Sequence, residues 1–356
     1  MKKINVLSPG FISPNSAAYL FPLIKFKSAL MDHDFDIVIK YAIDDDVTEC
    51  DFLLIDSKFF EKGWSKDFDG TLKSIAALNR KAKVIWCDQS DSTGTFLGQI
   101  LPHVHRYLKA QILKNRSEYM NNHYASRIYT EYYHKKYGIM DQSPFTDQPA
   151  KNKDDLKKIG ISWNSGFMHY GMIGPYMIKV RERIPLDSML AFASIRSRAK
   201  APRLVDVTCR MGISYEHDTI CYQRRKIRAI LKDTLSTDKI ARSAYFREID
   251  NSKICVSPFG MGEITLKDFE CFLSGSMLLK PDMNHMETWP NLFQDRKTCL
   301  FHSWDVDDIK DKIDWALRHN SERIEIAKAG QDLYESHTLG DNAGKLFAEH
   351  IKEILC

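Results

Sequence analysis

The stretch Ile254 to Met283, ICVSPFGMGEITLKDFECFLSGSMLLKPDM, decides the fold class of this chain. It begins with a short apolar strand and continues into a turn-forming segment that contains Gly260 and Gly262. The pattern then predicts a helix over 266–273, which ends at Ser274-Gly275, and a second apolar strand follows at once. A strand, a glycine loop, a helix and a returning strand together indicate a parallel α/β sheet.

The glycine loop also predicts an anion site. Glycines at a helix N-terminus let backbone N–H groups approach an anion closely, and the helix dipole favours negative charge there. Glu263 and Glu270 are seven residues apart and share one helix face. Carboxylates on that face are suited to bind the paired hydroxyls of a ribose or a sugar ring. A plain βαβ unit without a ligand site is the alternative.

The stretch resembles the nucleotide-sugar domain of GT-B glycosyltransferases, in particular exostosin-like members. The resemblance covers roughly residues 200–340, and Asn284 to Pro290 is similar to a continuation found in some bacterial polysaccharide enzymes. Members commonly carry Arg where this chain has Lys267, so a point-charge contact with phosphate is expected there. The matching residues, in chain order, are Ser257, Pro258, Gly260, Gly262, Glu263, Lys267, Glu270 and Gly275.

Upstream of this stretch, apolar strands and helices alternate in the same way. Strands are expected over 3–7, 35–41, 52–56 and 83–87, and a long helical region over 96–119. The polar segment Asp141 to Asp155 contains two prolines and predicts a linker. The expected fold is therefore α/β with two Rossmann-like domains, 1–150 and 151–356, that face a central cleft, with the C-terminal helices packing back. The second domain is expected to begin with a strand over 158–163 and a helix around Pro175 to Arg183.

Asp88 and Asp91 follow the expected strand 83–87, at an edge that would face the cleft. A carboxylate there is a candidate base for an acceptor hydroxyl. Alternatively, Asp91 or Ser92 caps a helix that begins near Phe96.

The resemblance implies that the donor lies in the C-terminal domain. Glu270 would hold ribose or sugar hydroxyls, and Glu263 with the Gly260/Gly262 loop would face sugar or phosphate. Lys267 or Arg210, which follows the strand over 203–208, would neutralise the leaving diphosphate. Asn164 and His169, in the first loop of the second domain, are further donor-binding candidates. We expect no metal ion, because basic side chains and helix dipoles stabilise the leaving group in this fold, and no cofactor besides the nucleotide sugar.

Positive charge is concentrated between Lys179 and Arg228, where twelve Lys and Arg oppose five Asp and Glu, although the whole chain carries only +4. Such a cluster could bind the phosphates of a ligand, contact an anionic membrane surface, or form a solvent-exposed helix face. Nucleic-acid binding is not expected, because no recognition motif accompanies the charge.

Composition sets the remaining bounds. An apolar share of 44% and a charged share of 28% are typical of globular proteins. The eight cysteines are scattered without metal-site spacing and are expected to be reduced. We find no signal peptide or membrane span and expect a cytoplasmic protein, with peripheral membrane contact through the basic cluster as an option.

These patterns predict a metal-independent glycosyltransferase that moves a sugar from a nucleotide-activated donor to a saccharide or lipid-linked glycan acceptor. The resemblance implies a role in bacterial surface polysaccharide synthesis, such as lipopolysaccharide. Two alternatives stay open: a transferase of the same fold that uses a CMP-activated acid sugar, and a non-catalytic nucleotide-sugar binding module. Asp88 or Asp91 would act as base only if the reaction inverts the anomeric centre.

Overall fold

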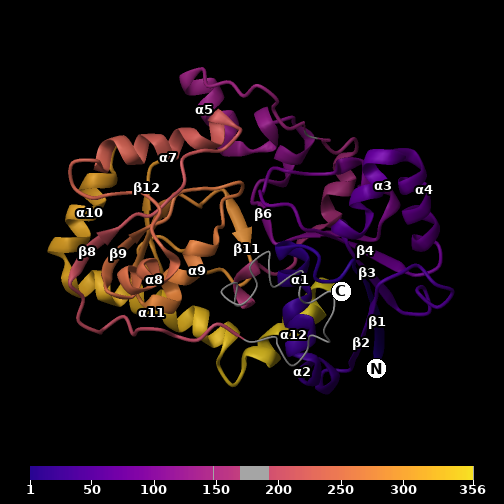
Figure 1. The fold of residues 1–356 in the computed structure, drawn as a ribbon. Helices are drawn as coiled ribbons and strands as arrows, with labels where there is room; N and C mark the ends of the chain where they lie inside the picture. The colour runs from indigo at the N-terminus through magenta and orange to yellow at the C-terminus, as the bar shows by residue number, and fades with distance from the viewer. Residues whose placement is uncertain (147, 169–191, 356) are drawn as a thin grey trace.

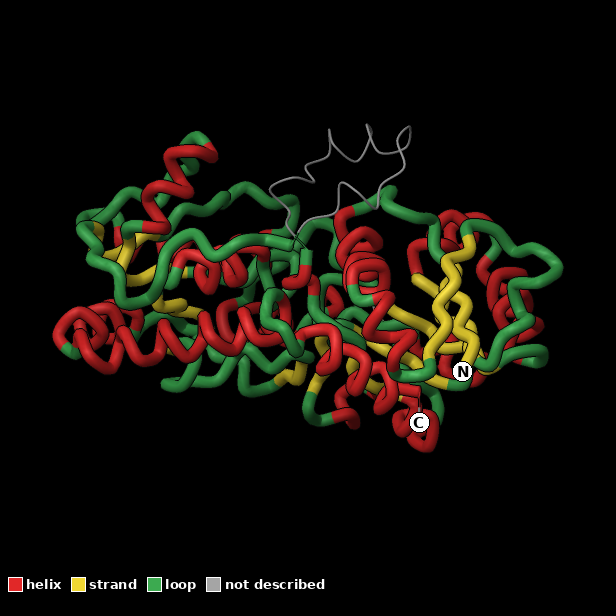
Figure 2. The backbone as a smooth tube through the Cα atoms, turned by 90° about the horizontal axis from the view of Figure 1, so that it is seen from below, coloured by secondary structure: helices red, strands yellow, loops and turns green. Residues whose placement is uncertain are grey.

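The computed structural model describes residues 1–146, 148–168 and 192–355. Two parallel sheets organise these residues, one in each half of an elongated molecule (Figure 1). Figure 2 shows their strands in separate groups along the long axis. This arrangement confirms the predicted α/β class with two parallel-sheet units.

The first sheet has six strands in the order β2-β1-β3-β4-β5-β7, and all of its pairs are parallel. The chain leaves β1 for β2 on one side and returns to β3 on the other, so the strand order reverses beside β1. Ligands of such sheets bind beyond the carboxyl ends of the strands at this reversal. The strands are β1 (Lys2–Leu7), β2 (Phe35–Lys40), β3 (Phe52–Asp56), β4 (Lys83–Asp88), β5 (Arg106–Lys109) and β7 (Ile159–Ile161).

Helices cover both faces of this sheet. On one face, Ile4 and Leu54 pack with Phe21 and with Phe347 from the C-terminal helix. On the other face, Leu53 packs with helix residues, which explains why all five residues of β3 are buried. The helices of this half are α1 (Pro14–Lys25), α2 (Lys27–Asp32), α3 (Glu61–Lys66), α4 (Phe68–Asn79) and α5 (Ile128–Tyr137).

The second sheet has four parallel strands in the order β12-β10-β9-β8. These are β8 (Val205–Thr208), β9 (Ser252–Val256), β10 (Met277–Pro281) and β12 (Leu300–His302). Around them lie α7 (Asp218–Leu231), α8 (Arg242–Asp250), α9 (Leu266–Ser274), α10 (Ile309–Arg318) and α11 (Asn320–Thr338).

Two features join the halves. Strand β6 (Gln111–Leu113) of the first half pairs antiparallel with β11 (Met286–Thr288) of the second, at the centre of the molecule (Figure 1). The C-terminal helix α12 (Ala343–Leu355) returns to pack beside α2, as the sequence predicts for the C-terminal helices.

Two expected elements differ from the structure. The helical region expected over 96–119 is wrong: the segment forms a short 3-10 turn over Gly98–His103, strands β5 and β6, and another turn over Arg116–Met120. Tyr107 and Leu108 are fully buried in the sheet, and this burial overrides the helical pattern. The strand expected to open the second domain is β7, which pairs with β5 in the first sheet. The helix expected around Pro175 to Arg183 lies outside the described residues.

Within the described ranges, no helix combines the length and the apolar character needed to cross a bilayer.

Candidate active site

A cavity of about 680 Å³ lies at the carboxyl ends of strands in the second sheet, and we call it the basic cavity. It lies where β8 and β9 end, against α8 and the first turns of α9. Its side chains include four residues predicted for donor binding after β9 and on α9, together with Arg210 after β8. The lining is Pro14, Arg210, Met211, Gly212, Tyr215, Arg224, Lys239, Ile240, Arg242, Tyr245, Phe246, Ser257, Pro258, Thr265, Leu266, Lys267 and Glu270.

Helix α9 starts at this cavity because its N-terminus is capped. Thr265 and Asp268 form a capping box, in which the Thr265 N–H donates to Asp268 Oδ2 at 2.8 Å. Asp268 also accepts from the Ser257 hydroxyl at 2.6 Å and forms a fully buried ion pair with Lys280 of β10 at 2.8 Å. The caps hold Ser257 and Thr265 at the cavity wall, and the positive end of the α9 dipole lies there with them.

Positive charge without a carboxylate partner distinguishes the basic cavity. Arg224 donates two hydrogen bonds to backbone carbonyls, from Nε to Phe259 at 2.6 Å and from Nη1 to Gly212 at 3.1 Å. Lys267 donates to the carbonyl of Arg210, whereas the Arg210 guanidinium itself is paired with Glu248 at 2.7 Å. In the part of the chain that the structure describes, four lining cations have no acidic partner within ion-pair distance: Arg224, Lys239, Arg242 and Lys267. Such a site favours an anionic ligand.

One carboxylate stands among these cations. Glu270 accepts a 2.7 Å hydrogen bond from the Tyr245 hydroxyl. Burial raises the pKa of Tyr245, so that hydroxyl stays protonated and acts as a donor. Tyr245 engages Oε2, which leaves acceptor capacity on the Glu270 carboxylate for a ligand hydroxyl.

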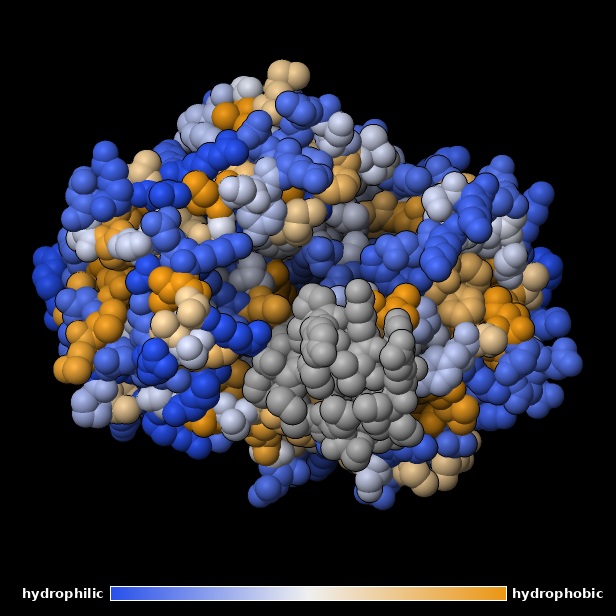
Figure 3. Space-filling view, in the orientation of Figure 1, coloured by the Kyte–Doolittle hydropathy of each residue, from blue (hydrophilic) through white to orange (hydrophobic). Residues whose placement is uncertain are grey.

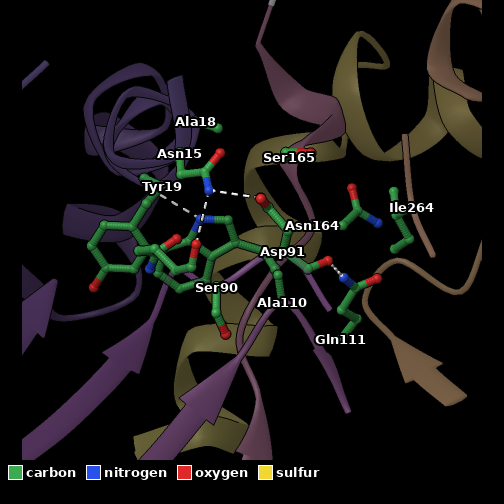
Figure 4. A pocket seen from close by; sticks show the side chains of 12 residues that line it. Asn15, Ala18, Tyr19, Ser90, Asp91, Ala110, Gln111, Asn164, Ser165 and Ile264 are labelled. Carbon is green, nitrogen blue, oxygen red and sulfur yellow. Dashed lines mark hydrogen bonds between the residues drawn. The ribbon is translucent and has the colours of Figure 1, made fainter. Parts of the chain in front are cut away.

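A second, smaller cavity of about 70 Å³ lies between the two halves (Figure 4). Asp91 is exposed here, and its Oδ1 accepts from Asn15 Nδ2 at 2.9 Å. The same Asn15 amide donates to the Gln89 carbonyl at 2.9 Å, which fixes its direction. The lining is Asn15, Ala18, Tyr19, Gln89, Ser90, Asp91, Ala110, Gln111, Trp163, Asn164, Ser165 and Ile264.

The two cavities are neighbours. Pro14 lines the basic cavity and Asn15 the small one, while Ile264 lines the small cavity and Thr265 the basic one. In each of these two segments, one residue faces one cavity and the next residue faces the other, so the cavities are adjacent. Figure 3 shows the surface recessed between the two halves.

Asp88, predicted as a base, is not available for that role. Its carboxylate is buried and accepts from Tyr107 at 2.6 Å, from Lys109 Nζ at 2.7 Å and from the Ser90 N–H at 2.8 Å. Burial opposes its ionisation, but Lys109 and these hydrogen bonds lower the pKa of Asp88 nevertheless. Asp88 lines neither cavity, and it holds β4 to β5.

Glu263, predicted to face sugar or phosphate, has no exposed surface. Its carboxylate accepts from the Thr93 N–H at 3.0 Å, from the Thr93 hydroxyl at 2.5 Å and from Ser92 at 3.3 Å. His285 Nε2 lies 3.6 Å away. Burial opposes ionisation, yet His285 and Thr93 lower the pKa of Glu263 to about 2. Glu263 therefore joins the halves.

The glycine loop also contributes to the contact between the two halves. A Cβ at Gly262 would lie 1.7 Å from the Asp91 carbonyl oxygen, so only glycine permits this approach. A Cβ at Gly260 would meet no atom closer than 3.4 Å, and the nearest one is Nη2 of Arg224. Neither glycine is among the residues that line the basic cavity or the small one, so the phosphate cradle stays a prediction.

The structure thus separates the predicted site residues into groups. Arg210, Ser257, Pro258, Lys267 and Glu270 line the basic cavity. Asp91 and Asn164 line the small cavity, so Asn164 lies apart from the other donor candidates. His169 lies outside the described residues.

Sequence reasoning missed several lining residues. Arg224 belongs to the basic cluster between Lys179 and Arg228, and the sequence does not distinguish it from its neighbour Arg225. In the structure Arg224 is buried, whereas Arg225 is exposed and pairs with Asp218. Lys239, Arg242 and Tyr245 lie outside the resembling motif and carry no local signal.

Comparison with known proteins gives one family. Residues 205–348 match the family model described as glycosyl transferase-like. The match confirms, for the C-terminal half, the glycosyltransferase resemblance predicted from residues 254–283.

No curated protein matches the chain. Among solved structures, it aligns with HepE from Anabaena in complex with UDP-glucose at 8% identity and a TM-score of 0.44, over 99% of this chain and 100% of that one. A glycosyltransferase from Rickettsia africae aligns at 10% identity and a TM-score of 0.46, over 99% and 98%. An alpha-glucosyltransferase in complex with UDP aligns at 9% identity and a TM-score of 0.42, over 100% of both chains.

Proposed function

We propose that the chain transfers a sugar from a nucleoside-diphosphate donor in the basic cavity to a saccharide or lipid-linked acceptor whose reacting hydroxyl lies at the small cavity. The observation that carries this proposal is a set of four cations around Glu270, at the capped N-terminus of α9, that have no acidic partner among the described residues. A diphosphate needs such positive charge, and a carboxylate beside it suits the hydroxyls of ribose or sugar.

In this proposal Arg224 and Lys267 bind the diphosphate, and Glu270 accepts from a donor hydroxyl. As the bond from the anomeric carbon to the phosphate oxygen breaks, its electron pair leaves with the diphosphate. Arg224, Lys267 and the α9 dipole stabilise that charge where it develops. Arg210 contributes through the loop it anchors, because Glu248 already neutralises its guanidinium.

Asp91 is the base of the proposed reaction. Its exposed carboxylate takes the acceptor hydroxyl's proton as the oxygen attacks the anomeric carbon, and the Asn15 amide orients it. Attack from the face opposite the leaving group inverts the anomeric centre.

We further propose that the first half, extended through β7, forms the acceptor unit and that residues 205–355 form the donor unit. A role in surface polysaccharide synthesis and a peripheral membrane contact belong to the same proposal and rest on the sequence resemblance.

Titration calorimetry with UDP, GDP, CMP and their sugar conjugates tests the donor site. We expect one nucleotide family to bind, and Lys267→Met and Glu270→Ala to weaken its Kd at least tenfold. The matched control is Lys232→Met, because Lys232 is exposed just beyond α7 and lines neither cavity. Failure of every nucleotide to bind the folded wild type would refute the donor site.

Asp91→Asn tests the base. We expect kcat to fall about 10²- to 10⁴-fold while the Kd of the donor is unchanged, because Asp91 lies outside the basic cavity. An Asp91→Asn variant that turns over at the wild-type rate, or a product with retained anomeric configuration, would contradict this role.

A further inference from the structure

A third cavity, of about 890 Å³, shares no lining residue with the two above. It lies beside the end of β6, the turns that follow it and α5, and we call it the β6–α5 cavity. The second half contributes two side chains to it, His285 and Trp304. Its volume falls within the range of small-molecule ligand sites.

Aromatic rings form a fixed wall of this cavity. The Trp304 ring is held by a 2.8 Å hydrogen bond from Nε1 to the Asp282 carbonyl. Tyr132 meets Trp304 edge to face at 5.3 Å, and its hydroxyl donates to Asp305 at 2.7 Å. His285 meets the same tryptophan edge to face at 5.0 Å. Rings held in this way present rigid apolar surface to a ligand.

Three amide side chains also line the cavity. Asn115, Asn121 and Asn122 line the cavity and are exposed. An amide both donates and accepts, so it pairs with a hydroxyl in either direction. Asn115 and Asn121 also donate to Glu118, at 3.2 Å and 3.3 Å, which orients both side chains.

The charges of the β6–α5 cavity largely cancel one another. Two lysines, Lys114 and Lys135, and two glutamates, Glu118 and Glu131, line it. Glu131 pairs with Lys135, and His123 lies 3.7 Å from Glu118. The basic cavity, with its four unpaired cations, has the opposite character. A neutral ligand therefore suits the β6–α5 cavity better than an anion.

We propose that the β6–α5 cavity binds a neutral oligosaccharide. A sugar ring has an apolar C–H face that packs on an aromatic ring, and hydroxyls at its edge that pair with amides. Tyr132 and Trp304 supply the first surface, and Asn115, Asn121 and Asn122 supply the second.

The position of the cavity suggests a role for such a ligand in the proposed reaction. Gln111 lines the small cavity and Leu113 the β6–α5 cavity, and these two residues are about 7 Å apart along strand β6. A glycan held in the β6–α5 cavity is thus near the acceptor end of the proposed reaction. This use rests on the proposed function, whereas oligosaccharide binding itself does not.

The test measures binding without any nucleotide. Maltohexaose, cellohexaose and chitohexaose are titrated into the full chain, and binding is followed by calorimetry and by saturation-transfer NMR. We expect one hexamer to bind, and Tyr132→Ala and Asn122→Ala each to weaken its Kd at least fivefold. Asn122 is exposed and no hydrogen bond of its side chain is found in the described part of the chain, so its replacement leaves the fold intact.

The matched control is Tyr41→Ala. Tyr41 is 61% exposed and directly follows β2, the edge strand of the first sheet on the side away from β5. Absence of binding by all three hexamers to folded protein would overturn the proposal. So would binding that both cavity variants leave unchanged. Hexamer binding by a chain that binds no nucleotide would refute the donor site and support this one.

Discussion

At Glu263, a carboxylate without exposed surface connects segments 170 residues apart in the chain. Its partners Ser92 and Thr93 directly follow Asp91, and Gly262 beside it touches the Asp91 carbonyl. The position of the proposed base is therefore set by residues of the second half. The sequence predicts that Glu263 faces a sugar or a phosphate, whereas in the structure it is buried and hydrogen-bonded to Ser92 and Thr93.

The low pKa of Glu263 predicts a pH-dependent stability. In the unfolded chain the pKa of a glutamate is about 4.3, and in the fold the pKa of Glu263 is about 2. The stabilisation is therefore complete above the unfolded value and is lost as the pH falls through the folded one. We expect Glu263→Gln to lose about 3 kcal/mol of unfolding free energy at pH 7. Urea unfolding from pH 7 to pH 2 checks this.

The control for that series is Glu49→Gln, at an exposed glutamate. It should follow the wild-type curve throughout. If Glu263→Gln and the wild type differ equally at pH 2 and at pH 7, the carboxylate charge does not stabilise the contact between the halves.

The two glycines of the loop give a matched pair. A Cβ at position 262 meets a backbone oxygen at 1.7 Å, whereas one at 260 meets its nearest neighbour at 3.4 Å. We expect Gly262→Ala to cost about 1–3 kcal/mol and to displace the Asp91 segment, so that activity falls. Gly260→Ala should unfold near the wild-type midpoint. Equal midpoints for both variants would contradict the close approach at Gly262.

At the scale of elements, α9 is anchored by a lysine that has no exposed surface. Lys280 of β10 pairs with Asp268 in the capping box at the N-terminus of α9. Lys109 of β5 holds Asp88 in the same way in the first half. In each unit, a buried lysine of one strand fixes the loop at the carboxyl end of its neighbour.

We expect Lys280→Met to destabilise the protein by about 3–5 kcal/mol, because the Asp268 carboxylate would stay buried without its partner. Lys328→Met is the control, since the Lys328–Asp332 pair is solvent-exposed and about 1 kcal/mol is the most it should contribute. Denaturant unfolding of both variants decides this. A small loss at Lys280 would show that the hydrogen bonds from Ser257 and Thr265 suffice to hold Asp268.

The elements that could be predicted from sequence are those with a local signal. The segment from β9 to β10 was predicted closely, because an apolar strand, a capped helix and a glycine stop follow one another there. The buried lysines could not be predicted, since Lys on a strand ordinarily indicates solvent. Asp88 and Glu263 were found as acids at strand and helix ends, but their burial depends on partners distant in the chain. Arg242 and Tyr245 reach the basic cavity only through the packing of α8 against α9.

At the scale of the whole molecule, the halves share a core. Phe347 and Ile351 of α12 belong to the same buried cluster as Ile4 and Leu54 of the first sheet. The β6–β11 pair forms a second connection at the centre. The chain thus closes on itself, with its last helix supporting its first strands.

This closure predicts that a substitution in the last helix loosens the first sheet. We expect Phe347→Ala to cost about 3–5 kcal/mol, because Phe347 has no exposed surface. Hydrogen exchange should then speed up by a similar factor in α12 and in the amides of β1 and β3. Lys345→Ala, at an exposed side chain on the same helix, should leave all of these rates unchanged. If only the amides of α12 responded to Phe347→Ala, the helix would be a separable cover, and the first sheet would hold its own core without it.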